Sequence, residues 1–125
     1  GFVVNLIGNH ELMNLQGDLR YVHPNEFSDA MHYGGYEPRK RAWSPGGALH
    51  KDFRERYLAT SVIDQTLFVH GGLEPSIIYA ALQMDAKTHP LDTINNKIKD
   101  LMGQTPMPHR VAKDKFANQL MGSQG

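Results

Sequence analysis

Three polar side chains follow two largely apolar stretches of the sequence. Asn9 and His10 come after residues 2–7 and a glycine, and His70 comes directly after residues 66–69. Imidazole nitrogens and amide oxygens can bind metal ions, and imidazoles also transfer protons. If both stretches are strands that end side by side, the three side chains meet at the carboxyl end of a sheet, where α/β proteins bind ligands. One of the adjacent pair can then hold an ion while the other faces a substrate.

These residue types also have purely structural uses. His70 could cap a strand by bonding to a backbone carbonyl, and Asn9 could be a turn or helix-cap residue. Glu11 falls in the first turn of the next expected helix, where a carboxylate suits the positive end of the helix dipole. The residues alone leave both interpretations open.

Two short motifs carry a resemblance to a known family. Gly8-Asn9-His10-Glu11 and His70-Gly71-Gly72-Leu73 resemble the third and fourth signature blocks of the phosphoprotein phosphatase family of calcineurin-like metallophosphoesterases. The run Met13–Val22 is similar to the Shewanella-like phosphatase branch. Two motifs in the family's order, each closing an expected strand, are a much stronger signal than one.

The resemblance assigns roles to three residues. It implies that Asn9 and His70 are metal ligands, through an amide oxygen and an imidazole nitrogen. It implies that His10 is the catalytic acid, which protonates the alkoxide that leaves a phosphate ester. Neutral ligands leave the metal ions more cationic, so that the ions attract a phosphoryl group more strongly.

A second group of residues has weaker assignments. Arg20 could contact phosphate or substrate, although a surface arginine paired with Asp18 or Glu11 is an equally good interpretation. Three aromatic residues farther along could line a groove, with local packing as the simpler interpretation: Tyr33, Tyr36 and Trp43.

The implied reaction is hydrolysis of phosphate monoesters by two divalent metal ions, manganese, iron or zinc. In such sites the ions lie about 3.5–4 Å apart and share a hydroxide that attacks in line. The family's usual substrates are phosphoserine and phosphothreonine proteins, and the Shewanella-like branch also admits phosphotyrosine. Asn9 and His70 are the only members of the ligand set that this sequence contains. We therefore expect residues 1–125 to be an inactive fragment of one catalytic domain, without its two upstream aspartate blocks and final histidine block.

Two other functions stay open. The first is a related phosphoesterase that acts on nucleotides such as diadenosine tetraphosphate. The second is a phosphatase-like binding module that has lost catalysis.

Composition limits the partners. Thirteen basic and thirteen acidic residues give a formal charge of zero, so we expect a phosphoprotein substrate and neither nucleic acid nor a membrane surface. No apolar run approaches the length of a membrane span, which predicts a soluble protein, cytoplasmic by default. The absence of cysteine excludes disulfides and thiolate metal sites.

The fold class expected is α/β, specifically a partial αββα sandwich of the calcineurin-like metallophosphoesterase fold. Apolar spacing and Gly or Pro signals predict a hairpin over residues 60–69 and an exposed connection over residues 33–41. They also predict helices at these positions: 11–16 closed by Gly17, 26–32, one starting at Ser44-Pro45, 75–84, 91–102 stopped by Gly103, and 111–121.

Overall fold

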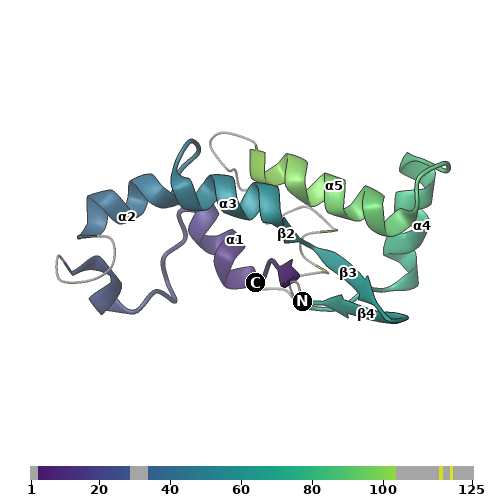
Figure 1. The fold of residues 1–125 in the computed structure, drawn as a ribbon, viewed down its shortest axis with the longest axis horizontal. Coiled ribbons are helices and arrows are strands. Elements are labelled where there is room, and N and C mark those ends of the chain that lie inside the picture. Colours follow the sequence, from purple (N-terminus) through teal and green to yellow (C-terminus); the bar gives the residue numbers. More distant parts are fainter. Residues whose placement is uncertain (1–2, 29–33, 104–115, 117–118, 120–125) are drawn as a thin grey trace.

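The structure, a computed structural model, describes residues 3–28, 34–103, 116 and 119. Within these residues the chain forms five α-helices, one 3-10 helix and two sheets of two strands each (Figure 1). The mixed α/β class is therefore confirmed. None of the described helices combines the length and apolar character that crossing a bilayer requires.

The first sheet brings together two distant parts of the sequence. Strand β1 (Asn5–Leu6) pairs in parallel with β2 (Tyr57–Leu58), and Ile7 N donates to Leu58 O at 2.9 Å. Helix α1 (Asn9–Gln16) begins after two further residues, so the chain turns directly from strand into helix. As predicted, Gly17 ends α1, with a φ of 82° that favours glycine.

The prediction of an exposed connection over residues 33–41 is wrong, because Tyr36–Trp43 form helix α2. Two structural reasons outweigh the run of polar residues there. Gly34 and Gly35 precede the helix with φ of 75° and 116°, a backbone conformation that favours glycine. Pro38 lies in the first turn, where a missing N–H breaks no helical hydrogen bond.

The helix start expected at Ser44-Pro45 is also wrong. Pro45 disfavours a helical backbone at the preceding residue, and Ser44 is extended and ends α2, with its Oγ donating to Lys40 O at 2.6 Å. Helix α3 (Ala48–Arg56) starts three residues after Pro45, with Gly47 as its cap. Phe53 of this helix is buried.

The second sheet is the predicted hairpin. Strands β3 (Thr60–Ile63) and β4 (Thr66–Val69) pair antiparallel, and the turn residues Asp64 and Gln65 have φ of 49° and 67°. Such a pair of left-handed residues is typical of a tight hairpin turn. Asn95 anchors the hairpin, since its Oδ1 accepts from Thr60 N at 2.8 Å and its Nδ2 donates to Thr60 O at 3.1 Å.

Two helices follow the hairpin, near their predicted positions. Helix α4 (Pro75–Met84) buries Ile77 and Ala81, whereas Leu82 is 38% exposed. Helix α5 (Pro90–Gly103) packs beside α4 and against α3 (Figure 1).

One hydrophobic core joins the helices to both strand pairs. Its buried members are Ile7, Leu12, Leu15, Phe53, Ala59, Ile77, Ala81, Ile94, Ile98, Leu101, Met102 and Phe116. Because α5 supplies four of them, this helix is the centre of the packing. The core fixes Ile7, and with it the turn into α1 that carries the candidate site.

Two predicted helices have a different outcome. The helix expected over residues 26–32 is a short 3-10 helix, η1 (Pro24–Phe27), ended by Ser28 in an extended conformation. Residues 29–33 and most of the helix expected over residues 111–121 lie outside the described residues.

Truncation of the core at α5 tests this packing. Leu101→Ala is expected to lower the free energy of unfolding by about 2–5 kcal/mol, since the side chain is 4% exposed and its removal leaves a cavity. Leu82→Ala, the same change at a half-exposed helical position, is expected to cost less than about 1 kcal/mol. Urea denaturation measures both. Equal losses would contradict the assignment of the core.

Candidate functional site

The structure places Asn9 and His70 in contact, as the two strand-end motifs predict. Their side chains meet although they lie 61 positions apart in the sequence, with His70 Nε2 and Asn9 Oδ1 separated by 2.8 Å. Because an amide oxygen only accepts, this hydrogen bond requires a proton on His70 Nε2. Asn9 is the first residue of α1 and His70 follows the last residue of β4.

Gly8 allows this contact by leaving space for the His70 ring. A Cβ at Gly8 would lie 3.3 Å from both Cε1 and Nδ1 of His70, and 2.7 Å from Glu11 Oε2. The Gly8 N–H donates to that Glu11 oxygen at 2.8 Å, which satisfies one of the free N–H groups at the start of α1. The predicted place of Glu11 in the first turn of the helix is thus confirmed.

His10 points into a different environment. Its ring stacks on Tyr21, with ring centroids 5.6 Å apart and an angle of 20° between the planes. Both rings line a small cavity of about 40 Å³, together with Met13, Asn14 and Asp18 among others. The contacts of the described residues therefore join two of the three predicted side chains, while the third, exposed to solvent, lies against an aromatic ring.

Arg20 pairs with Asp18, one of the two structural partners considered for it. Its guanidinium binds Asp18 through two nitrogens, with Nη2 2.8 Å from Oδ2 and Nε 3.0 Å from Oδ1. This hydrogen bonding lowers the pKa of the Asp18 carboxyl below its ordinary value of 3.8 and raises that of Arg20. Both side chains lie at the surface, so the pair orders the loop after α1 more than it stabilises the fold.

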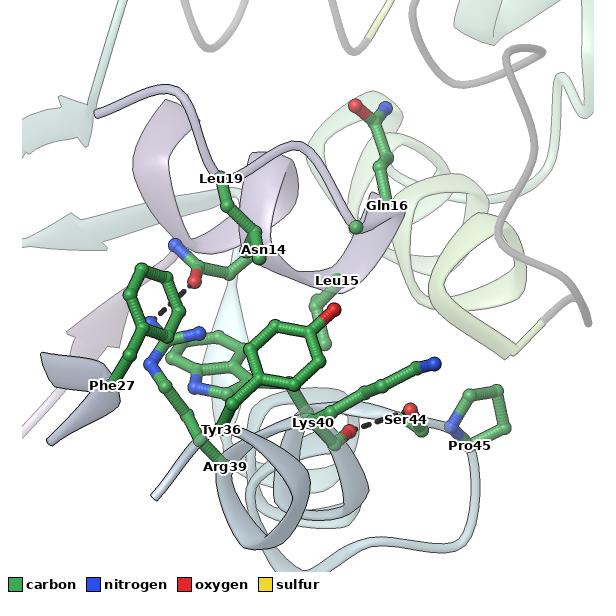
Figure 2. Close-up of a pocket in the computed structure, with 12 residues that line it drawn as sticks. Asn14, Leu15, Gln16, Leu19, Phe27, Tyr36, Arg39, Lys40, Ser44 and Pro45 are labelled. Carbon is green, nitrogen blue, oxygen red and sulfur yellow. Dashed lines mark hydrogen bonds between the residues drawn. The ribbon is translucent and has the colours of Figure 1, made fainter. Parts of the chain in front are cut away.

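Asn14 connects His10 to the interior. Its Nδ2 donates to the His10 carbonyl at 2.8 Å, and its Oδ1 accepts from Arg39 Nη2 at 2.6 Å (Figure 2). Arg39 is buried, in contrast to the solvated basic loop expected there. The amide of Asn14 therefore ties α1 to α2 at the turn of helix that follows His10.

Three contacts of the site were missed from the sequence. They are the stacking of Tyr21 on His10, the hydrogen bond from Arg39 to Asn14, and the hydrogen bond from the Gly8 N–H to Glu11. A fourth contact, between the Asn14 amide and the His10 carbonyl, could have been predicted, because residues four positions apart lie on the same face of a helix. Nothing in the sequence indicated which aromatic residue would stack on His10.

The metal-ligating groups of the described residues are few. No cluster of three or more His, Asp or Glu side chains lies close enough to hold an ion within this part of the chain. The Asn9–His70 pair brings one amide oxygen and one imidazole nitrogen together. The two atoms are 2.8 Å apart and are joined to each other by a hydrogen bond.

Comparisons with known proteins give relatives without an assigned activity. An uncharacterized protein of Acanthamoeba polyphaga mimivirus is 28% identical over 131 aligned positions, which cover 99% of this chain and 47% of that protein. An uncharacterized protein of Schizosaccharomyces pombe is 30% identical over 122 positions, which cover 96% of this chain and 32% of that protein. The chain thus spans about half and about a third of these relatives. No protein-family model and no solved structure matches the chain.

Substitution of Gly8 tests the close approach of His70. The backbone at Gly8 is extended, with φ −109°, so Gly8→Ala introduces crowding without backbone strain. We expect the Glu11 hydrogen bond to be lost, at a cost of about 0.5–1.5 kcal/mol, and the His70 ring to move. NMR of the histidine rings should show a shifted His70 signal beside an unchanged signal from buried His50. An unshifted His70 would contradict the geometry.

Proposed function

We propose that this chain is part of the catalytic domain of a metal-dependent phosphoprotein phosphatase of the Shewanella-like kind. Its two sheets and helices would then be one portion of the αββα sandwich of calcineurin-like metallophosphoesterases. The contact between Asn9 and His70 is the observation that carries the proposal, because it joins the two motifs that resemble the family.

The proposed ion-binding role of Asn9 and His70 follows from their chemistry. An amide oxygen and an imidazole nitrogen suit manganese, iron or zinc, and neither brings a negative charge. His70 can offer the Nε2 lone pair only when its proton lies on Nδ1, so ion binding requires the opposite tautomer from the one in the Asn9 hydrogen bond. When bound, two such ions supply a hydroxide nucleophile and neutralise charge on the phosphoryl group.

His10 is proposed as the acid that gives a proton to the leaving oxygen. Its ring is exposed to solvent, so a substrate can reach it, and its stacking on Tyr21 restricts the directions that it can take. An imidazole needs an anionic neighbour to stay protonated at neutral pH. Asp18 lines the same small cavity, but its carboxylate binds Arg20. We therefore assign this orienting role to a carboxylate from the family's upstream aspartate blocks.

The substrate proposed is a phosphoserine or phosphothreonine protein, with phosphotyrosine as a further substrate of the branch. A preference for diadenosine tetraphosphate over phosphopeptides would favour the nucleotide phosphoesterase instead. A parent polypeptide without the two aspartate blocks would favour the non-catalytic binding module.

Manganese binding can be tested on the 125-residue chain itself. Paramagnetic Mn²⁺ broadens the NMR signals of nearby nuclei, so a titration should broaden the signals of Asn9 and His70 before those of His89, which caps α5. We expect weak binding, since two neutral ligands without a carboxylate hold a divalent ion poorly. His70→Ala should abolish the selective broadening. Broadening that starts elsewhere would contradict the assignment of the two ligands.

The acid role is tested in a polypeptide that carries this sequence together with the aspartate blocks and the final histidine block. His10→Asn should keep the metal content and lower phosphate release from a phosphopeptide by about 10²–10⁴-fold, the usual contribution of a general acid. His70→Ala should lose metal and activity together, and His89→Asn should behave as wild type. A near-normal rate for His10→Asn would overturn the acid role.

A further inference from the structure

A cavity of about 360 Å³ lies away from the Asn9–His70 contact (Figure 2). Side chains of α1 and of the loop after it face those of α2 across it, and Phe27 of η1 closes one side. This volume lies in the range of small-molecule sites, about 300–1,000 Å³. Neither of the two short motifs that resemble the phosphatase family contributes to its lining, although five residues of the run Met13–Val22 do.

Aromatic rings make up much of the wall. Phe27 and Tyr36 form a tilted pair with centroids 5.7 Å apart, and Trp43 lies one helical turn beyond Arg39. The Arg39 guanidinium lies against two of these rings, 5.5 Å from the centroid of Phe27 and 5.4 Å from that of Trp43. The rings hold the cation in the wall and offer apolar surface to a ligand.

The electrostatics of the wall favour an anion. Arg39 and Lys40 both line the cavity, and no Asp or Glu is among the described residues that do. The Glu26 carboxylate, on η1, lies 3.8 Å from Arg39 Nε. Because Glu26 already compensates the Arg39 charge, the exposed Lys40 ammonium is the cation of this wall that pairs with a ligand anion. Trp43 Nε1 adds a buried donor that has no hydrogen-bond partner within the described chain.

We propose that this cavity binds a small carboxylate with a flat apolar body, such as an aryl carboxylic acid. A carboxylate carries one negative charge, which the Lys40 ammonium balances, and its oxygen can accept a hydrogen bond from the Trp43 indole N–H. A phosphate dianion would bring a second charge into a wall that is largely aromatic, where its loss of water costs more. The proposal goes beyond the phosphatase function and stands whether or not that function is correct.

The single tryptophan of the sequence makes the test direct, because Trp43 lines the cavity. Its fluorescence is followed while the 125-residue chain is titrated with phenylacetate or with the neutral isostere phenylacetamide. Acetate at equal ionic strength controls for unspecific salt effects. We expect a saturable change with phenylacetate and an affinity for the amide that is about tenfold lower, corresponding to the loss of one charge-assisted contact.

Paired variants locate the site. Lys40→Met and Tyr36→Leu remove an exposed cation and an exposed ring from the cavity and should weaken phenylacetate binding several-fold. Lys51→Met on α3 and Tyr79→Leu on α4 make the same changes elsewhere on the surface and should leave binding unchanged. Equal affinity for acid and amide would overturn the anion site. Absence of a saturable change, or equal effects of both members of a pair, would overturn the site itself.

Discussion

The close approach of His70 to Gly8 is the constraint on which the candidate site depends. A Cβ at position 8 would crowd the imidazole, which lies against the backbone that leads into α1 with its Nε2 beside the Asn9 oxygen. The approach needs both strand pairs in place. Parallel pairing of β1 with β2 sets the direction in which α1 begins, and Asn95 ties the hairpin that ends at His70 to α5.

Much of the local structure could be predicted because its signals are carried by a few neighbouring residues. The tight hairpin turn, the glycine that ends α1 and the proline that opens α4 each act over two or three positions, so their effect does not depend on the rest of the fold. Helix α2 was missed for the opposite reason. Its run of Arg and Lys is typical of an exposed loop, and the contacts that bury Arg39, with Asn14 and two rings, could not be inferred from that run.

The site was predictable to a similar extent. Repetition of an apolar stretch followed by a polar ligand-type residue correctly predicted that Asn9 and His70 meet. The orientation of His10 was not predictable, since adjacent residues at a helix start diverge and the side chain takes its direction from Tyr21, which arrives from a loop. The roles of these residues stay predictions, because a sheet of two strands and two neutral side chains are compatible with several chemistries.

Asn14 has a consequence for how the protein can vary. Its amide nitrogen donates to the His10 carbonyl, and its amide oxygen accepts from the Arg39 guanidinium. The same side chain lines both the small cavity beside His10 and the larger cavity beside Arg39. A carboxylate there would keep only the acceptor, and a hydrocarbon would keep neither. Because Asn14 lines both cavities, a substitution at this position changes the lining of both at once.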